Sequence, residues 1–168
     1  MKKLNLGCGL NYKEGWINLD FDRNIRADIY WDLNKLPWPF EDEEFDFILM
    51  ESILEHLDDL PSILKECHRI LKRKGLLKII VPHFTSSNAY GDLSHKHFFS
   101  LGSIKGSKTS LTFDKFFKIV EWKLRFGKKY AFWNYLVEFI ANKFPNLYES
   151  TPLRIFPALD IELLLQKT

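Results

Sequence analysis

Glycines and carboxylates follow four short apolar runs in the first half of the chain, at positions where strands would end. They are the turn Gly7-Cys8-Gly9 and the acids Asp20, Asp32 and Glu51. Ligands of open α/β sheets bind at the carboxyl ends of the strands, so we expect these groups to meet there. Glycines let the backbone approach a ligand closely. Asp20 can accept both hydroxyls of a ribose, and Asp32 can accept from an exocyclic amine such as that of adenine. Together the four groups predict an adenosine site.

A dinucleotide site is the rival interpretation, and the spacing argues against it. That site needs G-x-G-x-x-G at the start of a helix, with an acid about 20 residues further on. Tyr12 stands where the third glycine would be, and Asp20 lies only 13 residues beyond Gly7. Residues 10–15 leave no room for a helix, so no helix N-terminus is available for a pyrophosphate. The sequence therefore favours an adenosine ligand without phosphates.

The elements that must position these groups follow from short apolar runs. Such runs of four to eight residues suit strands buried on both faces of a parallel sheet. Five of them lie at 2–6, 16–19, 27–31, 45–50 and 76–81.

A helix is predicted between the last two runs. Apolar residues recur there at spacings of three and four from residue 60 to 71, and Pro61 suits a first helical position. The basic residues 72–74 suit the C-terminal end, and Gly75 suits the position just beyond it. Strand, helix and strand in this order make a right-handed βαβ unit.

The second half of the chain shows other patterns. Residues 112–120 have phenylalanines at helical spacing, whereas 121–127 and 159–166 alternate as half-buried strands do. The stretch 130–141 is apolar nearly all round, which predicts a buried helix. The alternative for 128–144 is a lid over an apolar acceptor, or a contact with a membrane or a second subunit, with Lys128, Lys129 and Lys143 at its ends.

Composition limits the class of protein. The chain has 168 residues and a net charge of +2, with 12 Lys and Arg against 7 Asp and Glu in residues 85–168. This charge is too small for a strong phosphate footprint, so we expect no nucleic-acid partner. Two cysteines cannot form a disulfide framework, which favours a cytoplasmic protein. No apolar run is long enough for a transmembrane helix.

Six motifs, in order, resemble those of the class I S-adenosylmethionine-dependent methyltransferases, and more narrowly the small type 11-like branch. They lie at 4–9, 15–20, 32–40, 45–46, 53–57 and 66–75. The resemblance implies a Rossmann-like, mostly parallel sheet with an antiparallel C-terminal strand pair, helices on both faces and shortened first crossover helices. It also implies a single domain over 1–168, with a cofactor-binding half at 1–82 and a substrate-facing half at 83–168 that holds a helical insertion at about 128–157.

The resemblance also implies roles for single residues. The backbone of the Gly7-Cys8-Gly9 turn would wrap the aminoacyl part of the cofactor, and Asp20 would hold the ribose hydroxyls. Phe21 would lie beside the adenine, Asp32 would take its amine, Leu33 would offer backbone contacts, and Glu51 would lie under the sulfonium. One departure is Asn5, which stands where the family usually has an acid.

The implied activity is transfer of a methyl group from S-adenosylmethionine to an oxygen or nitrogen of a small or carrier-linked acceptor. The fold alone does not fix the acceptor. The alternative is a non-catalytic S-adenosylmethionine-binding module, or a membrane-surface or interaction protein built on the same fold.

Four histidines follow predicted strand ends: His56, His83, His95 and His97. A base is needed only where the acceptor must lose a proton, and a histidine suits that task. We expect His56 and His95 to be the catalytic candidates, although His56 could instead cap a helix. The segment 92–99 resembles one that enters the substrate pocket in this branch. Asp92, His95 and His97 form an incomplete ligand set, so no metal site is expected.

Overall fold

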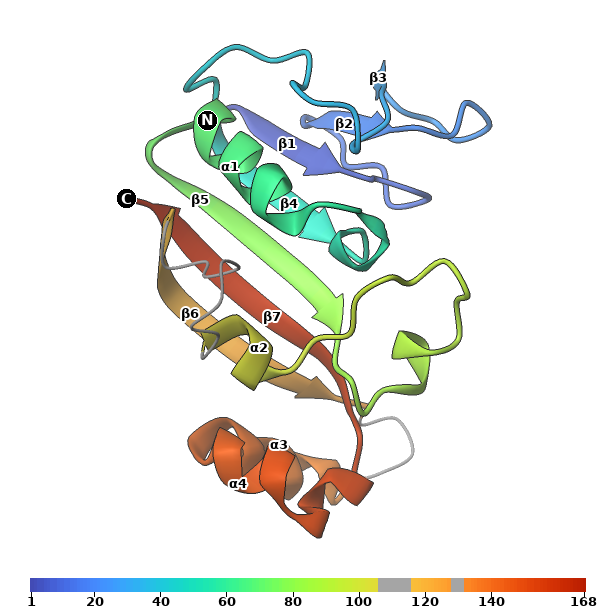
Figure 1. The fold of residues 1–168 in the computed structure, drawn as a ribbon, viewed down its shortest axis with the longest axis vertical. Coiled ribbons are helices and arrows are strands. Elements are labelled where there is room, and N and C mark those ends of the chain that lie inside the picture. Colours follow the sequence, from blue (N-terminus) through green and yellow to red (C-terminus); the bar gives the residue numbers. More distant parts are fainter. Residues whose placement is uncertain (106–115, 128–131) are drawn as a thin grey trace.

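The structure is a computed structural model that describes residues 1–105, 116–127 and 132–168. Its centre is a seven-stranded sheet in the order β3-β2-β1-β4-β5-β7-β6 (Figure 1). Strands β1 to β5 run parallel, and β7 is antiparallel to both β5 and β6. The Rossmann-like fold class with an antiparallel C-terminal pair is therefore confirmed. The strands are β1 (Lys3–Leu6), β2 (Ile17–Asp20), β3 (Ile29–Tyr30), β4 (Phe45–Glu51), β5 (Leu71–Pro82), β6 (Phe117–Phe126) and β7 (Ala158–Lys167).

The described helices are short, apart from two. They are η1 (Leu54–His56), α1 (Leu60–Ile70), η2 (Ser87–Ala89), α2 (Leu101–Lys105), α3 (Asn134–Lys143), α4 (Pro145–Ser150) and η4 (Pro152–Ile155). The five predicted strands and the predicted shortening of the first crossovers are confirmed, because β1, β2, β3 and β4 are joined by loops alone. Within the described ranges, no helix combines the length and the apolar character needed to cross a membrane.

Helix α1 begins as the sequence predicts but ends earlier. Asp59 caps it by accepting from the Ser62 N–H, and Pro61 lies in its first turn. Residues 72–74 and Gly75 belong to β5, so their assignment to the helix end was wrong. Leu71 pairs with Phe45 of β4 directly after the helix. A Cβ on Gly75 would lie 2.9 Å from the Lys72 carbonyl oxygen, so this glycine serves a close backbone approach rather than a helix cap.

The two faces of the sheet differ in burial. One row of paired residues is fully buried: Leu4, Ile48, Leu77 and Leu165. Helix α1 covers this face, where Cys67 lies against Met50, and α2 lies on it as well (Figure 1). The next row, on the opposite face, is only partly buried: Lys3, Phe47, Leu76 and Gln166. The helical layer expected on this second face is missing from the part of the chain that is described, because the short β1 to β4 connections hold no helices.

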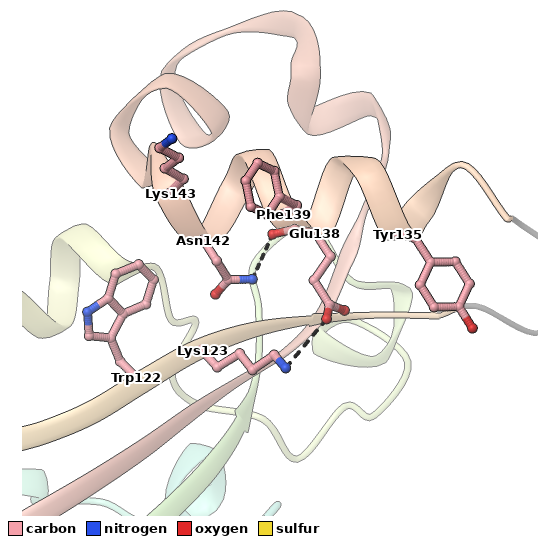
Figure 2. A pocket seen from close by; sticks show the side chains of 7 residues that line it. All are labelled: Trp122, Lys123, Tyr135, Glu138, Phe139, Asn142 and Lys143. Atoms are coloured by element: carbon pink, nitrogen blue, oxygen red, sulfur yellow. Dashed lines mark hydrogen bonds and ion pairs between the residues drawn. The ribbon is translucent and has the colours of Figure 1, made fainter.

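Helix α3 lies along β6, the strand at one edge of the sheet (Figure 2). Asn142 accepts from the Leu124 N–H at 2.8 Å through Oδ1 and donates to the Leu124 carbonyl at 2.9 Å through Nδ2. Glu138 accepts from the Phe126 N–H at 3.1 Å and pairs with Lys123 at 3.6 Å. Polar side chains of α3 therefore satisfy the edge backbone that would otherwise be open to pairing.

The prediction that 130–141 forms a buried helix was wrong for its described part. Large apolar side chains are exposed, among them Tyr135, Leu136 and Phe139, each more than 60% exposed. The buried residues of α3 are the polar Asn134 and Glu138 and the small Ala141. The helix is thus inverted relative to an ordinary amphipathic surface helix.

The predicted helix at 112–120 falls largely outside the described residues. Its described end, from Phe117 on, belongs to β6 and pairs with β7, so the helical prediction was wrong there. Phe117 is buried in the core. The two predicted alternating strands, 121–127 and 159–166, are confirmed within β6 and β7.

Glu149 ties α4 to the carboxyl end of β5 and the start of α2. Its carboxylate lies 3.1 Å from Nε2 of the fully buried His83 and accepts from the Leu101 N–H at 2.7 Å. Burial acts to raise the pKa of Glu149, but these hydrogen bonds outweigh it and hold the pKa below its ordinary value of 4.5. Ionised Glu149 therefore stabilises the fold.

We predict that Glu149 contributes to the loss of folding stability at low pH. Its stabilisation is fully present above the unfolded-state pKa and is lost as the pH falls through the lowered folded-state pKa. Urea unfolding of the wild type and Glu149→Gln at pH 7 and pH 3 measures this. The wild type should be the more stable at pH 7, and the difference should shrink at pH 3. A difference that stays constant with pH would contradict the assignment.

Candidate functional site

A cavity of about 680 Å³ lies at the carboxyl ends of the first four strands. Its volume is that of a small-molecule site. Six of the eight residues predicted to bind a cofactor line it: Gly7, Gly9, Asp20, Phe21, Asp32 and Leu33. One of the two catalytic candidates, His56, lines it as well, together with Asp92, Ser94 and Lys96 from a distant segment.

The Gly7-Cys8-Gly9 turn has a backbone conformation that favours glycine at its first and third positions. Gly7 and Gly9 have φ of +64° and +49°, a region that L side chains rarely adopt. A Cβ on Gly7 would lie 2.5 Å from Ile53, whereas one on Gly9 would meet nothing within 4 Å. The side chain of Cys8 is buried, and burial followed by the nearby Asp20 raises the pKa of its thiol. Cys8 can therefore face a ligand only through its backbone.

Asp20 links the turn to the end of β2. It accepts from the Gly9 N–H at 2.8 Å and from the Asp22 N–H at 3.0 Å, one with each carboxylate oxygen. A carboxylate has about four acceptor positions, so two remain for a ligand. The neighbouring Phe21 is 73% exposed and lines the cavity, which leaves its ring available for stacking.

Asp32 and Leu33 lie at the far wall of the cavity. Asp32 accepts from the Asn34 N–H at 3.0 Å and has Lys35 at 3.8 Å, so one carboxylate oxygen already closes a local turn. Leu33 is buried, and its carbonyl accepts from the indole N–H of Trp38. The wall is therefore fixed before any ligand binds.

Glu51 is not among the residues that line the cavity. Its carboxylate accepts from Asn11 at 2.9 Å. The next two residues, Ser52 and Ile53, line the cavity instead. Ser52 has a φ of +51°, a conformation that is costly for a serine and often found at functional sites. Both residues lie in stretches that the sequence analysis considered, but neither was predicted to bind a ligand.

The four histidines have different surroundings. His83 is fully buried beside Glu149, and His97 contacts the Leu57 carbonyl through Nε2 at 2.8 Å. His56 and His95 are brought together, with ring centroids 4.6 Å apart. Burial, followed by the nearby His95, lowers the pKa of His56. His83 and His97 thus contact Glu149 and Leu57, whereas the rings of His56 and His95 lie against each other.

Glu55 is a residue that the sequence analysis missed. Its side chain is 1% exposed and lies beside both His56 and His95. Desolvation by burial raises its pKa to about 7. The repeating apolar pattern around it gave no signal, since burial of Glu55 results from the segment 92–97 folding over η1. The ligand set considered from the sequence, Asp92, His95 and His97, is not the group that converges.

A glycine turn and two carboxylates at the carboxyl ends of a Rossmann-like sheet are the arrangement expected of a nucleoside site. Comparison with known proteins makes this more specific. Residues 8–79 match the model of the methyltransferase-domain family. The match covers less than half of the chain; with the motifs and the fold, it makes the chain similar to the class I S-adenosylmethionine-dependent methyltransferases.

Two uncharacterized proteins of Methanocaldococcus jannaschii are similar over part of the chain. One is 46% identical over 43 residues, which cover 26% of this chain and 20% of that protein. The other is 37% identical over 92 residues, with coverage of 46% and 39%. The matched part thus spans less than half of either relative.

Solved structures share the fold over nearly the whole chain. An S-adenosylmethionine-dependent methyltransferase from Archaeoglobus fulgidus has a TM-score of 0.71 at 19% identity, and the match covers 99% of this chain and 86% of that one. The [4+2]-cyclase SpnF has a TM-score of 0.62 at 15% identity, with coverage of 99% and 74%. The same fold therefore carries more than one chemistry.

The two glycines of the turn should respond differently to alanine. Gly7→Ala adds both an unfavourable φ and a clash with Ile53, so we expect a loss of about 2–4 kcal/mol in the free energy of unfolding. Gly9→Ala adds only the unfavourable φ, at about 1 kcal/mol. Urea unfolding measures both. In a double-mutant cycle, Ile53→Ala should partly relieve Gly7→Ala, and strict additivity would refute the clash.

Proposed function

We propose that the chain binds S-adenosylmethionine in the cavity at the ends of β1 to β4 and transfers its methyl group to an oxygen or nitrogen of a small or carrier-linked acceptor. The observation that supports this most is the convergence of the glycine turn, Asp20, Phe21 and Asp32 on one cavity. Each group alone has a simpler explanation as a turn or a cap. Their convergence matches an amino-acid part, a ribose and a base of one ligand.

Each wall of the cavity has a proposed task. The backbone of the Gly7–Gly9 turn lies against the aminoacyl part, and the free acceptor positions of Asp20 hold the ribose hydroxyls. Phe21 stacks on the adenine, Asp32 accepts from its amine, and Leu33 adds backbone contacts. Glu51 can act only at the rim, since Asn11 already donates to it and Ser52 and Ile53 form the wall beneath.

The cofactor, when bound, would supply an electrophilic methyl group that passes to the acceptor atom as the carbon–sulfur bond breaks and a neutral thioether leaves. The protein's part is to orient the two reactants and to exclude water. Where the acceptor must lose a proton, His56 is the histidine that lines the cavity. His95 does not line it and contacts the Ala89 carbonyl at 2.9 Å, so we assign it a positioning role. A non-catalytic binding module would keep the cofactor contacts and lack turnover.

Isothermal titration with S-adenosylmethionine tests the cofactor site. We expect a Kd in the micromolar range and about 5-fold weaker binding by Phe21→Ala, because stacking contributes about 1 kcal/mol. Phe21 is exposed, so this variant should fold normally. Phe132→Ala removes an equally exposed ring far along the sequence, in the segment before α3, and is the matched control. NAD should not bind. Absence of S-adenosylmethionine binding by folded protein would overturn the proposal.

The outward face of α3 supports a second proposal, contact with an anionic membrane surface. Aromatic and aliphatic side chains cover this face, and Lys143 lies within 6 Å of the rings of Phe139 and Phe144. Aromatic residues combined with lysines are typical of helices that lie at a lipid interface. A carrier-linked or apolar acceptor would be consistent with such a location.

Vesicle cosedimentation tests the membrane contact. Wild-type protein should pellet with vesicles that contain phosphatidylglycerol and stay in solution with neutral phosphatidylcholine vesicles. Leu136→Asp should reduce the bound fraction several-fold, since it places a charge in the apolar face. Leu10→Asp changes a still more exposed leucine, next to the glycine turn, and should have no effect on vesicle binding. Concentration-dependent doubling of the mass without vesicle binding would assign the surface to a second copy instead.

A further inference from the structure

A buried carboxylate without a partner lies next to two histidines at η1. Neither carboxylate oxygen of Glu55 has a hydrogen-bond partner among the described residues, although the side chain is almost fully buried. Buried carboxylates are normally paired, hydrogen-bonded or coordinated to a metal ion. Nε2 of His95 is 4.0 Å from Oε1 of Glu55, beyond hydrogen-bond distance. Glu55 therefore lacks the partner that its burial requires.

The surroundings of His95 fix which ring nitrogen has a lone pair. Its Nδ1 lies 2.9 Å from the carbonyl oxygen of Ala89. A carbonyl oxygen only accepts, so Nδ1 carries the hydrogen. In the neutral ring, Nε2 then offers its lone pair toward Glu55. A backbone carbonyl that orients the second nitrogen in this way is the usual support of a metal-binding histidine.

A chain of hydrogen bonds fixes His56 in the same form. Its Nδ1 lies 2.9 Å from Oγ of Ser94, and this hydroxyl donates to Oδ1 of Asp92 at 2.6 Å. Because the single hydroxyl hydrogen is used on Asp92, Ser94 must accept from the N–H of His56. The Nε2 lone pair of His56 is therefore free of this network. Asp92, Ser94 and His56 form a carboxylate-supported histidine.

We propose that Glu55, His56 and His95 bind one divalent transition-metal ion of the zinc type. One ligand atom from each residue lies within 4.8 Å of the others. Two imidazoles and a carboxylate are a set that binds zinc and similar ions, and three protein ligands leave at least one coordination position open. A gap of 4.0 Å between Glu55 and His95 is too wide for a hydrogen bond, and small side-chain rotations would bring both within reach of an ion between them.

The ion would lie next to the cavity, because His56 is part of the cavity wall. A metal ion in such a position would lower the pKa of a bound hydroxyl or water, so an acceptor hydroxyl could release its proton to solvent without a histidine base. This last consequence alone rests on the proposed methyl transfer. Binding of the ion itself does not depend on it.

Metal binding can be measured without cofactor or acceptor. Chelator-treated protein is titrated with Zn²⁺ by calorimetry and with Co²⁺ by visible absorption. We expect one ion per chain and a higher melting temperature with Zn²⁺. Glu55→Gln and His56→Gln should weaken Zn²⁺ binding by at least about 100-fold, and Ser94→Ala, which removes support from His56, by about 10-fold.

His68→Gln is the matched control, since His68 is a partly buried histidine on α1 that packs against Phe116 and Phe117. It should leave Zn²⁺ affinity unchanged. If Glu55→Gln fails to fold, His56→Gln decides, because His56 is only partly buried. Absence of stoichiometric binding, or binding that survives both Glu55→Gln and His56→Gln, would overturn the metal site. S-adenosylmethionine titrated into the same samples shows separately whether the cofactor site is intact.

Discussion

The connection between β1 and β2 contains no helix, so its backbone groups have no intrahelical partners. The buried side-chain amide of Asn18 forms hydrogen bonds with them instead. Backbone groups of a loop packed on a sheet must find hydrogen-bond partners. Asn18 accepts from the Lys13 N–H and donates to the carbonyls of Lys13 and Trp16, and Asn5 reaches the Asn11 carbonyl. Asn5 also donates to Asn18, so the two amides form one buried unit. The placement of the glycine turn over the cavity depends on this unit.

This arrangement explains the asparagine at a position where the family usually has an acid. Asn5 has both a donor and an acceptor, and its Nδ2 donates to Asn11 and Asn18. A carboxylate has only acceptors and could make neither bond. Asn5 therefore supports the loop, and in the proposed function contact with the cofactor is left to Asp20 and the backbone of the turn. Loss of the first crossover helix and the change at Asn5 are two parts of one structural solution.

The sequence predicted those parts of the fold and site whose signal is local. Asp20, Asp32 and the glycine turn directly follow apolar runs, so their meeting at one sheet edge follows from parallel strands. The predicted helix end at Gly75 was wrong because pairing of Leu71 with Phe45 overrides the local preference. The buried face of α3 is polar because its side chains form hydrogen bonds with the backbone of the edge strand β6. Glu55 could not be recognised, because its burial depends on contacts some forty residues away in sequence.

Those contacts join the two halves of the chain at η1. The Glu55 carbonyl accepts from the N–H groups of Lys96 and His97, and Lys96 pairs with Asp58 at 2.6 Å. On the other side of the same short helix, Ile53 lies where a Cβ of Gly7 would be. A shift of η1 would therefore move the wall against the glycine turn and the His56–Glu55 pair together. The glycine turn and the segment 92–97 therefore both pack on η1, and under the proposed methyl transfer this short helix would set the distance between the two reactants.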